Sequence, residues 1–247
     1  MNQGLRISYV VPVHNQEAVL RESVMRLVTR LHDFPGSEAL LIENGSTDAS
    51  IAVCVELAQQ LSTEQVGVRV TASAKGMGYA LRHGMELASG DLLVLTAADL
   101  PFGFTDLDAF LATEPRPRLA IGSKAHPKSH TVIPLRRRIM SGAFGLLRRA
   151  TLGSGVRDSQ GTILLDRAVA HDVLPHLRCS DFLISAEIIC WAERAGVTPV
   201  EVPVTYVARG ASTVSPVRDS LRMAGGLLAL RRRLRATPDA DLGTERA

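Results

Sequence analysis

Short apolar runs alternate with helix-like segments in the N-terminal part of the chain, and this alternation constrains the fold more than any other feature. The runs are Ile7–Val13, Ala39–Ile42, Val66–Thr71 and Leu92–Leu95. Each is almost wholly apolar, which is typical of strands buried on both faces of a sheet. Strands that alternate with helices form a largely parallel sheet, because a parallel crossover needs a helix-length connection. We therefore expect an α/β fold: a Rossmann-like, mixed, mostly parallel sheet with helices on both faces.

The segments between the runs have the spacing of amphipathic helices. Apolar residues recur at intervals of three and four within 20–31, 54–61 and 78–88, so that each segment has one apolar face. Asn15 is expected to cap the first helix, and Glu17 favours its first turn.

Polar residues follow the apolar runs at the points where the strands should end. They occupy Pro12–Glu17, Glu43–Asp48, Ala74–Gly78 and Asp99. In sheets of this kind ligands bind at the carboxyl ends of the strands. The sequence therefore predicts a ligand site at that edge.

The second half of the chain is less regular. The expected strands and helices are Leu119–Ser123, Gly161–Leu165 and Val197–Val207, then Leu135–Arg149 and Phe182–Ala195. The closing segment 217–235 reads as a strongly basic amphipathic helix. Such a helix suits the surface of an anionic membrane, and the alternative is a helix docked on the protein with a solvated end.

Composition excludes several classes of protein. The chain has 247 residues and a net charge of +3, too small a surplus to indicate nucleic-acid binding. Its three cysteines, without His–Cys ligand spacing, indicate neither a disulfide framework nor a zinc site. There is no apolar run of roughly 18 residues and no signal-peptide core. We expect a cytoplasmic protein, at most peripheral on the cytoplasmic membrane face; its oligomeric state stays open.

Three common catalytic or nucleotide-binding motifs are absent. The sequence contains neither GxxxxGKS nor Gly-x-Ser-x-Gly. The loop Lys75–Ala80 lacks the third glycine of a dinucleotide fingerprint and follows the third predicted strand instead of the first.

The strand-end segments taken together resemble family 2 glycosyltransferases. Val11–Glu17 is similar to their opening VPxxNE segment, and Glu43–Asp48 to their DDGSTD. Lys75–Gly84 resembles their GKGxAxRxG segment, and Ala97–Asp99 stands where they carry Asp-x-Asp.

The resemblance continues, in the same order, through nearly the whole chain. Ile121–Lys124 resembles the GSR of dolichyl- and polyprenyl-phosphate sugar synthases, and Val156–Gly161 the VRDTQCG of their dolichyl-phosphate glucosyltransferase branch. Arg209–Ser215 and Arg218–Met223 resemble the closing segment.

The resemblance implies a single GT-A domain over 1–236. Residues 1–99 would bind the nucleotide-sugar, 100–216 would form the acceptor half, and 217–236 the basic helix, which would be the point of any peripheral membrane contact. We expect 237–247 to be a disordered tail. The implied activity is transfer of a sugar from a UDP- or GDP-sugar donor to a polyprenyl- or dolichyl-type lipid phosphate by an inverting displacement.

The resemblance also assigns the donor-binding residues. Carboxylates there would accept hydrogen bonds from ribose hydroxyls or a base N–H, and cations would neutralise the diphosphate. The residues are Pro12, His14, Asn15, Glu17, Glu43, Asp48, Lys75, Gly76, Arg82, Ala98 and Asp99. The alternatives are a turn with a helix cap for Glu43–Asp48 and solvated charges for Lys75 and Arg82.

The expected metal site departs from the family pattern. Family members hold Mg²⁺ or Mn²⁺ with two aspartates, but here Ala97 replaces the first and only Asp99 remains. Pro101 stands where a third polar ligand is common. A hard cation needs several oxygen ligands, so either the metal site is weakened, or lysines replace it, or donor chemistry is lost.

The acceptor half carries the other candidate residues. A lipid phosphate is already ionised, so the enzyme needs positively charged side chains to bind and orient it but needs no general base. Lys124, Arg138 and Ser141 are the expected phosphate-binding residues, in a cluster with Lys128, Arg136 and Arg137. The alternative for this cluster is a solvated or membrane-facing run of charges. The candidate catalytic residues besides Asp99 are Asp158 and Gln160, which would shape the donor–acceptor junction, and Glu187, for which a salt bridge at the edge of the core is the alternative.

Two other functions fit the sequence. In the first, the acceptor is a soluble small molecule or natural-product intermediate, which the lack of a membrane-spanning segment favours. A non-catalytic glycosyltransferase-like binding subunit would explain the loss of an aspartate at Ala97.

Overall fold

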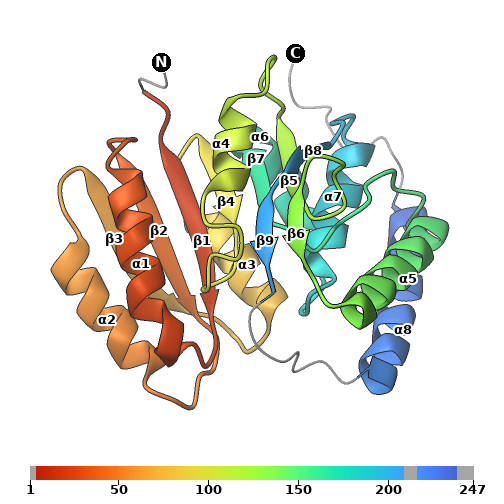
Figure 1. The fold of residues 1–247 in the computed structure, drawn as a ribbon, viewed down its shortest axis with the longest axis horizontal. Coiled ribbons are helices and arrows are strands. Elements are labelled where there is room, and N and C mark those ends of the chain that lie inside the picture. The colour runs from red at the N-terminus through yellow and green to blue at the C-terminus, as the bar shows by residue number, and fades with distance from the viewer. Residues whose placement is uncertain (1–3, 209–215, 238–247) are drawn as a thin grey trace. The chain divides into compact units, whose positions relative to one another are not determined.

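The computed structural model describes residues 4–208 and 216–237 (Figure 1). The chain forms two compact units. Unit 1 comprises Met1–Pro101 and Thr162–Ile184, and unit 2 comprises Phe102–Gly161 and Ser185–Ala247.

Unit 1 contains five strands in the order β3-β2-β1-β4-β7. They are β1 Ile7–Val13, β2 Ser37–Glu43, β3 Val66–Ala72, β4 Leu92–Leu95 and β7 Ile163–Asp166. The first four are parallel to their neighbours, and β7 pairs antiparallel with β4. This confirms the mixed, mostly parallel sheet, and all four apolar runs are strands.

Helices cover both faces of this sheet. In Figure 1, α1 (Glu17–Leu31) and α2 (Ser50–Leu61) lie in front of the strands, and α3 (Met77–Leu87) lies behind them. Helix α3 approaches β1 closely: a Cβ built on Gly84 would come 2.2 Å from Val10 Cγ1. Glycine is therefore needed at position 84 for this helix to pack against the sheet. The three predicted helices are confirmed.

The described residues of unit 2 form two pairs of parallel strands and four helices. Strand β5 (Leu119–Ser123) pairs with β8 (Val200–Pro203), and β6 (His130–Val132) pairs with β9 (Thr205–Val207). The helices are α4 Thr105–Leu111, α5 Leu135–Leu152, α7 Ile184–Arg194 and α8 Pro216–Ala236.

One strand expectation in this half is wrong. The predicted strand 197–207 is two strands, because β8 and β9 pair with different partners. The break falls at Val204, which is buried and whose N–H donates to Ser129 Oγ at 2.9 Å. A side-chain hydroxyl therefore takes the place of a strand partner at this residue.

Several short elements were not predicted. They are α4, β6, α6 (Arg167–Val173) and the 3-10 turn Leu174–His176. For α6 a signal was present: Asp166 accepts a hydrogen bond from Val169 N at 2.9 Å and caps the helix. An aspartate before apolar residues at helical spacing is an N-terminus signal.

Some expectations lie outside the described residues. These are the closing segment 209–215 and the tail beyond Thr237. The side chains at 136, 137 and 216–224 also lie outside the description. Among the helices that the structure describes, none combines the length and apolarity needed to cross a bilayer.

Candidate functional site

The loops that follow β1 and β2 are tied together by hydrogen bonds at the carboxyl edge of the sheet. Asn15 N donates to Ser46 Oγ at 3.1 Å, and Thr47 N donates to Asn15 Oδ1 at 2.8 Å. Gln16 N donates to Ser50 Oγ at 2.8 Å. Side chains thus satisfy the backbone of both loops, which holds the two strand tips in one arrangement.

Glu17 and Asp48 join these loops to the helices that follow them. Asp48 Oδ2 accepts from Glu17 N at 3.3 Å, and Glu17 Oε2 accepts from Ala49 N at 3.2 Å. Asp48 Oδ1 accepts from Ser50 N at 3.0 Å. The hydrogen bonds from Ser50, with that from Glu17 N, lower the pKa of Asp48. Its carboxylate therefore stays ionised at the first turns of α1 and α2.

The segment Pro12–Gln16 differs from expectation at one residue. Asn15 was expected to cap α1, but Gln16 is the N-cap residue and Asn15, at φ +53°, turns toward the β2 loop. Pro12 is buried in β1, and His14 is half-buried. His14 Nδ1 is buried and has no hydrogen-bond partner among the described residues.

Glu43 and Lys75 lie on either side of the β2 loop. Glu43 is nearly buried and accepts a hydrogen bond from Ser46 N. Lys75 is exposed, and its stem covers Gly45: a Cβ built on Gly45 would lie 3.3 Å from Lys75 Cβ. Burial, with the nearby charge of Glu43, raises the pKa of Cys54 to about 12. The thiol is therefore protonated and inert, while the lysine is an accessible cation beside the loop.

The start of α3 is packed closely against the segment before α7. Gly76 has φ +137°, and a Cβ there would come 2.4 Å from Ser180 O. Arg82 Nη1 donates to Leu177 O at 3.0 Å, and its guanidinium lies 5.3 Å from the Tyr79 ring centroid. Arg82 is thus engaged by this segment, and Lys75 is the exposed cation at the β2 loop.

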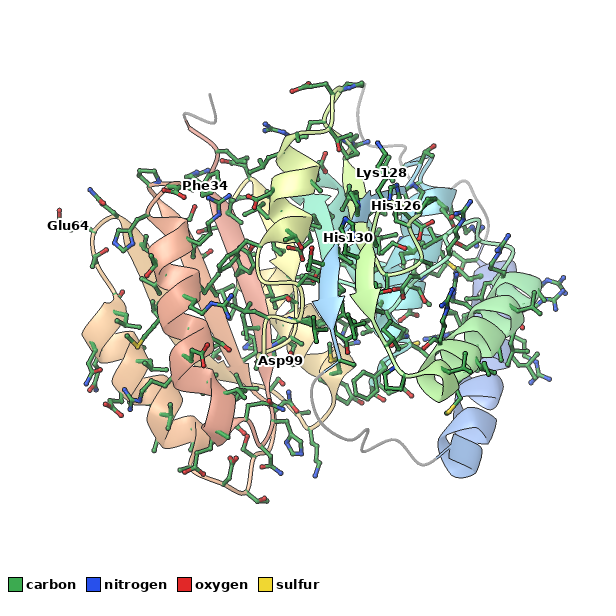
Figure 2. All side chains as sticks on the ribbon, viewed as in Figure 1. Phe34, Glu64, Asp99, His126, Lys128 and His130 are labelled. Atoms are coloured by element: carbon green, nitrogen blue, oxygen red, sulfur yellow. The ribbon has the colours of Figure 1, made fainter. Side chains whose placement is uncertain are left out.

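The loop after β4 presents one carboxylate. Ala98 is buried, whereas Asp99 is exposed beyond the end of the strand (Figure 2). Leu100, at φ +44°, donates its N–H to Ala97 O at 3.0 Å and closes the turn.

In unit 2, Lys124 and Asp158 form a partly buried ion pair. Lys124 Nζ lies 2.9 Å from Asp158 Oδ2, and Lys124 N donates to the same oxygen at 3.0 Å. Asp158 Oδ1 accepts from Gln160 N at 3.0 Å, and Gln160 O lies 3.5 Å from Lys124 Nζ. The structure therefore brings together three of the residues predicted from the sequence.

Phe102, Tyr206 and Glu201, which sequence reasoning missed, complete this cluster together with Ser123 of the GSR-like motif. The ammonium of Lys124 lies 5.4 Å from the ring centroid of Phe102 and 5.8 Å from that of Tyr206, within cation–π range. Glu201 Oε1 accepts from Ser123 Oγ at 2.6 Å and from Asp158 N at 3.1 Å. No local pattern marks these residues, because each contact joins distant parts of the chain.

The remaining acceptor candidates lie on other elements. Arg138 and Ser141 are exposed on α5. Figure 2 shows Lys128 on the loop before β6, close to His126. Glu187, fully buried on α7, forms an ion pair with Arg233 Nη2 of α8 at 3.0 Å.

A mixed, mostly parallel sheet whose carboxyl edge bears acidic loops and a lysine is the architecture of GT-A glycosyltransferases. Residues 8–172 match the family described as Glycosyl transferase family 2, and the chain belongs to that family. The chain is accordingly a glycosyltransferase, as the sequence predicted.

Relatives and solved structures share most of the chain. It is 26% identical over 252 residues to the dolichyl-phosphate beta-glucosyltransferase of Saccharomyces cerevisiae, covering 93% of this chain and 75% of that protein. It is 28% identical to glycosyltransferase AglD of Haloferax volcanii, covering 91% of this chain but only 37% of AglD. Glucosyl-3-phosphoglycerate synthase from Mycobacterium tuberculosis, in complex with UDP, has a similar fold, with a TM-score of 0.65, 20% identity, and coverage of 97% and 83% of the two chains.

Solved structures of that synthase contain Mg²⁺ or Mn²⁺ beside UDP or UDP-glucose. Among the described residues of this chain, no three histidine, cysteine, aspartate or glutamate side chains form a metal-ligating group. The loop after β4 supplies Asp99 alone, with Ala97 where a second carboxylate would stand. Asp99 is one oxygen donor for a cation that takes about six, so the remaining ligands would have to be diphosphate oxygens and waters. The residues present therefore fit a weakened metal site.

Proposed function

We propose that this chain transfers a sugar from a nucleotide-sugar to a polyprenyl- or dolichyl-type lipid phosphate, with inversion at the sugar. Relatives named for dolichyl-phosphate glucosyl transfer align with more than nine-tenths of the chain. Solved structures of similar fold contain UDP and UDP-glucose, which favours a UDP-sugar donor.

The strand tips of unit 1 support donor binding there. Lys75 is an exposed cation directly before α3, whose N-terminus favours anions. It lies beside the loop of Glu43 and Asp48, which would border the nucleoside. The buried Nδ1 of His14, without a partner among the described residues, offers a further polar contact. The diphosphate charge would be met by Lys75 and by this helix N-terminus.

The observation that carries the acceptor assignment is the state of the carboxylates in unit 2. Glu187 is paired with Arg233, and Asp158 with Lys124. Glu193 accepts from Ser154 Oγ. Glu201 likewise binds a serine hydroxyl and a backbone N–H. These four carboxylates are thus engaged as acceptors, so proton abstraction by any of them would compete with an existing ion pair or hydrogen bond. An acceptor that is already an anion needs no base.

The reaction follows from these roles. A phosphate oxygen of the acceptor attacks C1 of the donor sugar, the bond from C1 to the diphosphate oxygen breaks, and the nucleoside diphosphate leaves with that electron pair. No proton has to be removed from the acceptor. Lys124 is held by Asp158 and two aromatic rings. Because its ammonium has three N–H donors, it can still donate a hydrogen bond to the incoming phosphate. Arg138 would supply a second cation.

A kinetic comparison tests this proposal. The wild type, Lys124→Ala and Arg138→Ala are assayed for nucleoside-diphosphate release with UDP-glucose and a short, detergent-dispersed polyprenyl phosphate. Each variant should raise the KM for lipid phosphate about tenfold, because it loses one charge-assisted hydrogen bond to the phosphate. The affinity for the donor should stay within about twofold of that of the wild type. Arg26→Ala, an exposed helical arginine on α1, is the matched control. Unchanged turnover of the lipid phosphate by both variants would refute the assignment.

A soluble anionic acceptor is the second candidate. The neighbour of similar fold was solved with phosphoglyceric acid, and the same cationic residues would suit such a molecule. Assays with phosphoglyceric acid in place of the lipid phosphate separate the two. Turnover of the soluble acid alone would reject the lipid assignment while leaving the donor assignment intact.

A further inference from the structure

Helix α5 exposes a continuous row of apolar side chains. Leu135 is 70% exposed, Ile139 63% and Leu146 70%, and Ala143 and Ala150 are also exposed. Their spacing of four, four, three and four residues places all five on one face of the helix. Large apolar side chains are rarely exposed in such a row unless the surface has a partner. We call these five residues the α5 stripe.

The charged side chains of α5 itself are all positive. Helix α5 contains no aspartate or glutamate. Arg138 and Arg149 are exposed, and at 100° per residue both fall along the same edge of the stripe. An apolar row bordered by arginines is the pattern of a helix that lies in the plane of an anionic membrane surface.

The opposite face of α5 is already occupied. Arg148 is fully buried and donates to Val156 O, and Phe144 is half-buried. Helix α5 also packs against α8. The stripe is therefore the outward face of a docked helix.

The apolar side chains of α8 have a different position. Leu227 and Leu230 are fully buried inside unit 2, whereas Leu228 between them is 54% exposed. The basic C-terminal helix was expected to provide any membrane contact. That contact stays a prediction, because the side chains at 216–224 lie outside the description. Helix α5 presents a second exposed apolar surface.

We propose that the α5 stripe docks the protein on an anionic lipid bilayer, with its leucines and isoleucine among the acyl chains and Arg149 at the phosphates. A symmetric contact with a second copy fits less well, because it would bring the arginines of both stripes close together. The inference does not rest on the identity of the sugar acceptor.

Sedimentation with vesicles of phosphatidylcholine and phosphatidylserine, without any polyprenyl phosphate, tests the proposal. The wild type should bind these vesicles at least tenfold more tightly than vesicles of phosphatidylcholine alone, and less tightly at high salt. Leu135→Gln/Ile139→Gln/Leu146→Gln should reduce binding at least tenfold, and Arg149→Gln should reduce it severalfold. Thermal melts check that the variants fold, as their side-chain exposure leads us to expect.

A matched control replaces exposed apolar residues of unit 1: Met25→Gln/Ile51→Gln, 50% and 49% exposed, should bind like the wild type. Equal binding of the stripe variant and the wild type overturns the proposal. So does a wild-type dimer without vesicles that the stripe variant loses, since this assigns the stripe to a second copy. Sugar transfer to detergent-dispersed acceptor is measured separately, so a failure of docking is distinguishable from a failure of the proposed activity.

Discussion

At the scale of single residues, Glu38 is a buried carboxylate that links three parts of unit 1. It accepts hydrogen bonds from Ser8 Oγ, Ser89 N and Ser89 Oγ, each at 2.7 Å, and pairs with Arg69 Nη2 at 2.6 Å. Burial by itself raises the pKa of Glu38, but the serine hydrogen bonds and the charge of Arg69 outweigh it and lower the pKa below its ordinary value. The ionised form is therefore favoured by folding.

The free energy of unfolding should depend on Glu38 in a pH-dependent way. Because the pKa is lower in the folded chain, the contribution is full above the unfolded-state pKa of about 4.3 and is lost as pH falls through the folded value. Glu38→Gln should lower stability by about 2 kcal/mol at pH 7, and by progressively less below pH of about 4. Urea titrations across this range measure the difference. Glu64→Gln, on an exposed loop (Figure 2), is the control, and a pH-independent deficit for Glu38→Gln would contradict the argument.

At the scale of elements, α8 is anchored to α7 through polar groups. Glu187 pairs with Arg233. Arg194 donates to the carbonyls of Leu234 and Thr237, so it caps the C-terminal end of α8. A buried carboxylate that has lost its partner is strongly destabilising. Glu187 thus has a structural role, because it holds α8 against α7 through Arg233. This role is separate from the catalytic role that the family resemblance implies.

Arg233→Met should destabilise the protein by about 3 kcal/mol, because it leaves the Glu187 carboxylate buried without its ion pair. The double variant Glu187→Gln/Arg233→Met should regain part of that loss, since no charge is then buried. Thermal or urea unfolding measures both, with the exposed Arg232→Met as control. A wild-type kcat for Glu187→Gln, measured where it is fully folded, would reject the catalytic role; unchanged stability of Arg233→Met would reject the anchoring role.

At the scale of the whole molecule, nucleotide binding depends on the balance between a divalent cation and the protein's own cations. The loop after β4 offers one exposed carboxylate, Asp99, and Lys75 is an exposed lysine beside the β2 loop. We expect nucleotide binding to depend on Lys75 more than on a divalent cation.

Restoring the missing carboxylate should change that balance. Calorimetry of UDP binding with Mn²⁺, and again with a chelator, should show less than about threefold weakening for the wild type when the metal is removed. Ala97→Asp should bind UDP more tightly with Mn²⁺ and lose more than about tenfold without it, because two carboxylates then share the cation. Ala97→Asn, similar in size but uncharged, is the control. Abolition of wild-type binding by the chelator would contradict the expectation.

The strands and helices of residues 7–95 were predictable because their signals are local. Apolar runs and helical spacing are read from neighbouring residues, and each strand of the predicted set formed. The second half was harder because its strands are short. Strands β8 and β9 are separated by one residue and bind different partners, which no periodicity reveals.

What the sequence alone determined is the class of fold, the family, and the strand ends at which polar residues gather, since composition and order are sufficient for these. Only the tertiary structure decided which partner each polar side chain takes. Asp48 accepts from Glu17 N at the start of α1, Lys124 lies near two aromatic rings, and Glu187 binds an arginine of the last helix. The physical reason is that these contacts join residues far apart in the chain, and their free energy is gained only once the backbone has brought them together.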